Sequence, residues 1–82
     1  MGLEREEFAA EVEDVFGILI PGEDAARMAT PRDLVRFIRD QMPAAKRLPE
    51  AEIEEAVLRL LAEHAYRARA LTLDTHFRDI FP

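Results

Sequence analysis

The first sixteen residues carry acidic side chains at a spacing suited to binding rather than to catalysis. Glu4, Glu7, Glu11 and Asp14 follow one another at intervals of three or four residues, so on a helix they share one face. A row of carboxylates attracts a partner that presents Arg or Lys, and it speeds and orients the encounter more than it strengthens the complex. The alternative is a solvated helix face without a partner.

The other reactive residue types form no catalytic or metal-binding pattern. The chain has no cysteine, which excludes disulfides and thiolate metal sites, and it has no serine. His64 and His76 are too far apart for the usual spacing of a metal pair. We expect His64 to pack on the apolar face of a helix and His76 to lie in an exposed loop. Adjacent acids such as Glu6 and Glu7 lack any sign of a pocket, so we expect no enzyme activity.

The net charge of the chain lies near its N-terminus. Of the 82 residues, 17 are acidic and 11 are Lys or Arg, which gives a net charge of −6. The stretch through Met28, with eight acids and two arginines, accounts for all of it. The negative electrostatic potential of this stretch repels nucleic acid and anionic lipid and favours a protein partner with a basic surface. The small basic cluster of Tyr66, Arg67 and Arg69 is too weak to reverse this preference.

Length and hydropathy predict a single small domain, residues 1–82, in the cytoplasm. A chain of this size buries roughly 60% of the surface of its unfolded state. The sequence shows neither the basic and apolar pattern of a signal peptide nor an apolar run of membrane-spanning length. We therefore expect no membrane association.

The first predicted helix covers residues 3–16, where apolar side chains recur on a helical period. Gly17 follows at the position where a left-handed residue commonly ends a helix. An extended loop that turns Ile18 and Ile20 inward comes next, and a short helix falls within residues 23–28. The apolar stripe of the first helix consists of Leu3, Phe8, Val12 and Phe16.

A second long helix begins at a strong start signal. Thr30 can cap the helix, Pro31 suits its first position, and Asp33 can complete a reciprocal capping box. We expect this helix to reach about Met42. Its buried stripe consists of Leu34, Val35, Ile38 and Met42.

A third long helix opens at Pro49, after a connector that spans residues 43–49. Its predicted apolar face consists of Ile53, Val57, Leu60, Leu61 and His64. A final short turn near Phe77 would be capped by Asp74 or Thr75. The sequence thus predicts an all-α bundle with three longer helices and one or two short ones.

The order of these segments resembles part of the acyl carrier proteins and their peptidyl carrier relatives. The stretch "LEREEFAAEVEDVFGILIPGEDAARMATPRDLVRFI" is similar to the second and later helices of that family. In the family an acidic helix ends in Phe-Gly, an Ile-x-Ile-Pro loop follows, and a Thr-capped last helix closes the bundle. Residues 1–42 match this part without a gap.

The second half of the chain resembles the segment that precedes the acidic helix in carrier proteins. Residues 50–82 look like the family's first helix and the loop after it, and Phe77-Arg78-Asp79-Ile80 stands where that loop carries a buried Phe. The resemblance therefore implies a circularly permuted bundle, joined through residues 43–49. It also implies that Phe77 and Ile80 pack beside the helix that begins at Leu3. We expect this within a monomer, with a dimer formed by segment exchange as the alternative.

The resemblance does not extend to the attachment point of the prosthetic group. Carrier proteins bear phosphopantetheine on the serine of an Asp-Ser-Leu motif, which falls on Met1-Gly2-Leu3 in this chain. Leu3 is kept, but Gly2 has no side-chain oxygen to form the phosphodiester. We therefore expect no cofactor.

The resemblance implies that docking is retained without the cofactor. In the family, basic patches on partner enzymes bind the acidic helix. The matching residues here are Leu3, Glu4, Glu7, Glu11 and Asp14. The chain would then be a non-enzymatic interaction module that docks to a basic partner of acyl, peptidyl or polyketide-type biosynthesis.

Three other functions remain open at this stage. The chain could be a genuine carrier, loaded at an unidentified residue or at a serine that a longer natural chain supplies. It could be a homo-oligomeric structural protein closed by segment exchange. It could also hold an acyl chain in a helical pocket between Phe8, Val12, Leu34 and Ile53.

Overall fold

Three long helices form the body of the molecule in a computed structural model, which describes residues 3–64 and 71–81. Over this part of the chain the structure is helical and contains no strand, which confirms the all-α prediction. The long helices are α1 (Leu3–Phe16), α3 (Pro31–Gln41) and α4 (Glu50–His64). The short elements are α2 (Gly22–Arg27), the 3₁₀ turn η1 (Ala44–Lys46) and α5 (Phe77–Ile80).

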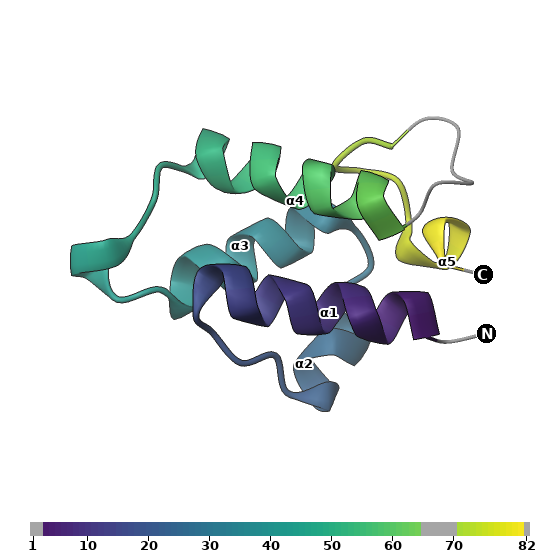
Figure 1. Cartoon of the computed structure of the whole chain (residues 1–82), viewed down its shortest axis with the longest axis horizontal. Coiled ribbons are helices and arrows are strands. Elements are labelled where there is room, and N and C mark those ends of the chain that lie inside the picture. The colour runs from purple at the N-terminus through teal and green to yellow at the C-terminus, as the bar shows by residue number, and fades with distance from the viewer. Residues whose placement is uncertain (1–2, 65–70, 82) are drawn as a thin grey trace.

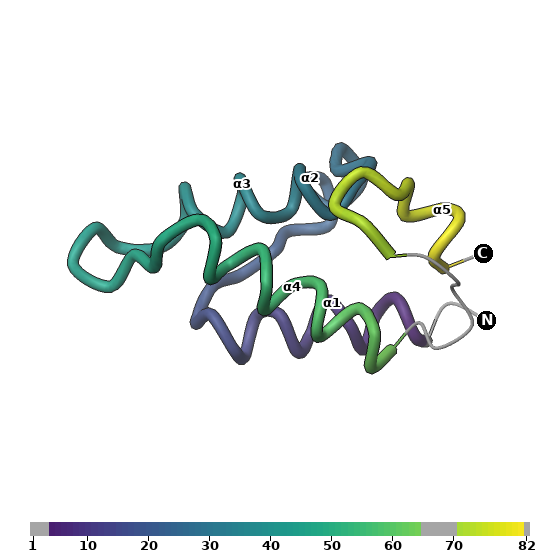
Figure 2. The backbone as a smooth tube through the Cα atoms, turned by 90° about the horizontal axis from the view of Figure 1, so that it is seen from above, coloured from purple at the N-terminus to yellow at the C-terminus, as the bar shows by residue number. Residues whose placement is uncertain are grey.

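Helix α4 packs against both α1 and α3 and runs opposite to each of them (Figures 1 and 2). The predicted apolar stripes meet between these three helices and form the core. The side chains that are almost completely enclosed include Val12, Ile38, Ile53, Val57 and Leu61. Burial of side chains of this kind contributes about 1.5–3 kcal/mol each, so this layer supplies most of the stability of the bundle.

The ends of α1 and α3 follow the local signals in the sequence. Gly17 has a φ of +66°, and its N–H and that of Ile18 donate to the carbonyl of Glu13 at 2.8 and 3.2 Å. At the start of α3, the Asp33 N–H donates to Thr30 Oγ1, and the Thr30 N–H donates to Asp33 Oδ2. Both the glycine stop and the reciprocal capping box are therefore confirmed.

The C-terminal segment lies beside the start of α1 and the start of α3 in the same chain (Figures 1 and 2). The ring of Phe8 is 6.3 Å from that of Phe77 and 5.6 Å from that of Phe81, between centroids. Phe77 and Ile80 are buried. The packing expected between this segment and the first helix is thus present within one subunit.

Two main-chain hydrogen bonds fix this segment to the start of α3. The Phe77 N–H, at the start of α5, donates to the Ala29 carbonyl at 2.8 Å. The Arg32 N–H, in the first turn of α3, donates to the Leu73 carbonyl, also at 2.8 Å. The first N–H groups of a helix lack partners within the helix, so each of these helices supplies a donor that the neighbouring segment accepts.

The structure adds one element to the prediction and corrects two others. The connector between α3 and α4 contains the turn η1, where three residues form a single 3₁₀ turn. The cap of α5 is His76, whose Nδ1 accepts the Arg78 N–H at 3.3 Å, and not Asp74 or Thr75. The Asp74 carboxylate turns to Arg32 instead, and His76 is half-buried rather than exposed.

Candidate docking surface

The predicted docking acids follow one another along one side of α1. We call Glu4, Glu7, Glu11 and Asp14 the acidic stripe. Glu4, Glu7 and Asp14 are exposed, whereas Glu11 is half-buried. Leu3 is the first residue of α1, and its side chain, like Gly2, lies outside what the structure describes. The stripe therefore offers three exposed carboxylates over nearly the whole length of the helix.

Glu11 is held by a residue of the opposite helix. Its Oε1 lies 2.5 Å from His64 Nε2, and the two side chains keep 40% and 21% of their exposure. The His64 ring also meets Phe8 edge-on, with centroids 6.2 Å apart and an interplanar angle of 68°. The prediction that His64 packs on the apolar face is confirmed. Its pairing with Glu11 was not predicted, because helical spacing identifies neighbours within a helix and not across two helices.

Glu13 has a structural role on the other side of α1. Its Oε2 accepts the Ile20 N–H at 2.6 Å, while its carbonyl accepts the N–H groups that close the helix. This carboxylate therefore holds the loop that follows α1, in which Ile18 is buried and Ile20 half-buried, as predicted. Not all acids of the first third of the chain are available to a partner.

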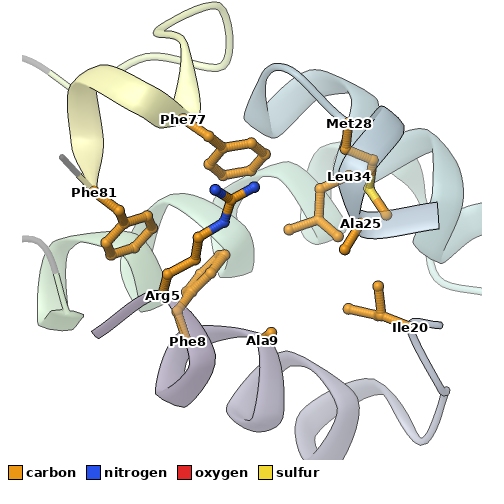
Figure 3. Close-up of a pocket in the computed structure, with 9 residues that line it drawn as sticks. All are labelled: Arg5, Phe8, Ala9, Ile20, Ala25, Met28, Leu34, Phe77 and Phe81. Carbon is orange, nitrogen blue, oxygen red and sulfur yellow. The ribbon is translucent and has the colours of Figure 1, made fainter. Parts of the chain in front are cut away.

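A small apolar cavity lies where α1, α2 and α5 meet, and its volume is about 50 Å³. Figure 3 shows the Arg5 side chain extending between the aromatic rings at one side of this cavity. Pockets that hold ligands usually have volumes of about 300–1,000 Å³. The cavity is lined by Arg5, Phe8, Ala9, Ile20, Ala25, Met28, Leu34, Phe77 and Phe81.

The acyl-chain pocket expected between Phe8, Val12, Leu34 and Ile53 is not present in that form. Val12 and Ile53 are fully buried in the core and do not line the cavity. They lie at the interface where α4 packs against α1 and α3, and close packing of a core leaves no space for a ligand.

The ion pair between Arg32 and Asp74 secures the C-terminal segment from the solvent side. Arg32 Nε and Nη2 donate to the two carboxylate oxygens of Asp74 at 2.8 and 3.0 Å. The hydrogen bond with Arg32 lowers the pKa of Asp74, and the same bond raises the pKa of Arg32. Because both groups are exposed, the pair fixes geometry more than it adds stability.

Within residues 3–64 and 71–81, no three His, Cys, Asp or Glu side chains are grouped so that they could hold a metal ion. The basic cluster of Tyr66, Arg67 and Arg69 lies outside the described residues. None of the described helices is both long and apolar enough to cross a membrane.

Comparison with known proteins returned no similarity for this chain. No protein-family model matches it. Neither a search of curated proteins nor a search of solved structures found a match.

Proposed function

We propose that the chain is a non-enzymatic module, similar to an acyl carrier protein, that docks through the acidic stripe to a protein partner with a basic surface. The observation that carries this proposal is the exposure of Glu4, Glu7 and Asp14 on one side of α1. These carboxylates have the spacing that places them in a row, and a partner with several Arg or Lys gains association rate and orientation from such a row.

The position of the C-terminal segment supports the carrier-like, circularly permuted arrangement. In the family that the sequence resembles, the loop with the buried Phe precedes the acidic helix. Here Phe77 contacts Phe8 of α1 although the two residues lie at opposite ends of the sequence. Helices α3 and α4 run in opposite directions, so a short connector is sufficient to join them.

The module would work without phosphopantetheine, as a monomer in the cytoplasm, and in acyl, peptidyl or polyketide-type biosynthesis. With Gly2 in place of the serine, no side-chain oxygen is available to form the phosphodiester at that position. The net charge of −6 makes nucleic acid an unfavourable partner.

Exposure to a broad-specificity phosphopantetheinyl transferase and coenzyme A tests the absence of the prosthetic group. We expect the intact mass of the protein to remain unchanged. A stoichiometric gain by the mass of the phosphopantetheine arm would establish a genuine carrier and overturn this part of the proposal.

The same transferase, without coenzyme A, serves as a basic probe for docking. Glu4→Lys with Glu7→Lys should weaken its binding about tenfold, since each exposed charge contact contributes up to about 1 kcal/mol and two are reversed. Added salt should reduce the wild-type affinity. Binding is measured by fluorescence anisotropy.

Glu52→Lys with Glu55→Lys is the matched control for this experiment. These exposed acids of α4 have the same spacing, and one of each pair lies in a first helical turn. The control should retain most of the binding. Equal weakening by both double variants would show that net charge alone governs the encounter, which would remove the docking role of the acidic stripe.

A further inference from the structure

A second surface, distinct from the acidic stripe, lies at the opposite end of α1 from α5. An open groove separates the loop after α1 from the C-terminal half of α3, and its volume is about 380 Å³. This is within the range of pockets that hold ligands and well above the cavity beside α5. We call it the loop groove, and its lining includes Ile18, Leu19, Pro21, Asp24, Phe37 and Gln41.

The loop groove exposes an apolar side chain that the fold itself does not use. The loop is extended, so Ile18 turns into the core while Leu19 remains 77% exposed. Leu19 is the most exposed large apolar residue in the described part of the chain. Phe37, on the other wall, is only half-buried. Contact with both side chains would remove apolar surface from water, which is the main source of affinity in small interfaces.

The negative charge of the loop groove determines which ligands it favours. Among the described residues that line it, Asp24 is the only ionisable one. Within residues 3–64 and 71–81, the Asp24 carboxylate has no ion-pair or hydrogen-bond partner, while the Asp24 N–H donates to the Pro21 carbonyl at 3.0 Å. A ligand that places a positive charge beside its apolar group is therefore favoured over one that places a negative charge there.

Two arginines near the loop groove, one on α3 and one in the connector after it, are bonded elsewhere. Arg39 of α3 pairs with Glu50 at 3.2 Å. Arg47 donates to the Met42 carbonyl, also at 3.2 Å. The charge of Arg36 acts on Asp74 and contributes to the lowering of its pKa. Neither Arg39 nor Arg47 bonds to Asp24, so these two residues do not pair with the carboxylate at the loop groove.

We propose that the loop groove is a docking site for a segment of another protein that inserts an aromatic or long aliphatic side chain next to a Lys or Arg. This goes beyond the proposed function, because it involves no residue of the acidic stripe and does not require a carrier-like role. A second copy of this chain fits less well. In the described part of the chain, its exposed basic and apolar segment is at Lys46 to Leu48, where Leu48 is only 38% exposed and Arg47 is held by its own chain.

The test is a titration of the ¹⁵N-labelled chain with a capped glycine–phenylalanine–arginine–glycine peptide, followed by NMR. We expect the amide signals of residues 17–24 and 37–41 to shift in a concentration-dependent way. The same peptide with glutamate in place of arginine should bind about threefold more weakly, the effect expected for one exposed ion pair. A peptide with alanine in place of phenylalanine should bind at least tenfold more weakly.

Four variants assign the effects to residues. Asp24→Asn should abolish the preference for the arginine peptide, whereas Glu23→Gln, the neighbouring exposed acid, should preserve it. Leu19→Ala should weaken binding of the arginine peptide at least about threefold, and Leu48→Ala, outside the loop groove, should not change it. Leu19, Glu23 and Leu48 are exposed and Asp24 is half-buried without a side-chain partner, so the ¹⁵N spectrum of each variant should retain the wild-type dispersion.

Three results would overturn the proposal. The first is the absence of shifts in the loop groove at millimolar peptide. The second is a preference for arginine that survives in Asp24→Asn. The third is a shift of the same signals on raising the concentration of the chain alone, lost in Leu48→Ala, which would make a second copy the occupant.

Discussion

Replacement of Phe77 by alanine tests whether the C-terminal segment is part of the cooperative fold. Phe77 is only 7% exposed, and its ring lies against Phe8 at a centroid distance of 6.3 Å. Truncation of a buried Phe to Ala destabilises proteins by about 3–5 kcal/mol. Because α5 is a single turn at the edge of the bundle, where the site can partly collapse, we expect about 3 kcal/mol.

The expected loss is large compared with the stability of the whole domain. At roughly 0.05–0.15 kcal/mol per residue, a chain of 82 residues has a free energy of unfolding of about 4–12 kcal/mol. A loss of about 3 kcal/mol corresponds to a fall in Tm of roughly 12–24 °C for a domain of this size. Thermal and urea unfolding followed by circular dichroism measure both quantities.

Two further variants show whether the effect comes from burial of the ring. Phe77→Leu preserves most of the apolar contact and loses the aromatic pair, so its effect should be about 1 kcal/mol. Leu19→Ala also truncates an apolar residue, but an exposed one, and should stay within about 0.5 kcal/mol of wild type. If Phe77→Ala were no more destabilising than Leu19→Ala, the packing of α5 against α1 would not contribute to the fold.

Three other perturbations probe two side-chain pairs and one backbone conformation. A double-mutant cycle with Glu11→Gln and His64→Gln should give a coupling of about 1 kcal/mol in urea unfolding, and additive effects would mean that the contact is not stabilising. Since Arg32 lowers the pKa of Asp74, the wild type should lose stability as the pH falls from about 4 through that lowered pKa. Asp74→Asn should lose less stability over the same pH range. An equal loss of stability in the variant and the wild type would contradict the role of the pair. Gly17→Ala should cost about 1–2 kcal/mol from backbone strain alone, because a Cβ there meets no atom within 4 Å, and an unchanged Tm would contradict the left-handed geometry.

The helices could be predicted because their signals are local. The end of α1 follows from Gly17, and the start of α3 follows from the capping box of Thr30 and Asp33, both of which depend on residues within one turn of each other. The buried stripes follow from helical periodicity for the same reason. The contact between Phe77 and Phe8 could be expected only through the resemblance to a known arrangement of segments.

The partners of surface side chains could not be predicted from local patterns, because they depend on contacts between separate elements. Of the four acids in the stripe, Glu11 faces His64, and no pattern within α1 distinguishes it from Glu7. The choice of His76 rather than Asp74 as the cap of α5 likewise depends on Arg32, which is 42 residues away from Asp74. The loop groove has no signature in the sequence, because its walls come from two separate segments.

The two main-chain hydrogen bonds between residues 29–32 and 73–77 determine which substitutions these positions tolerate. They join the carbonyls of Ala29 and Leu73 to the N–H groups of Phe77 and Arg32. As hydrogen-bond acceptors, positions 29 and 73 can be filled by any amino acid, since each has a carbonyl. Positions 32 and 77 must not become proline, which has no N–H to give. The junction between the C-terminal segment and the start of α3 can therefore persist in descendants that carry different amino acids at these four positions.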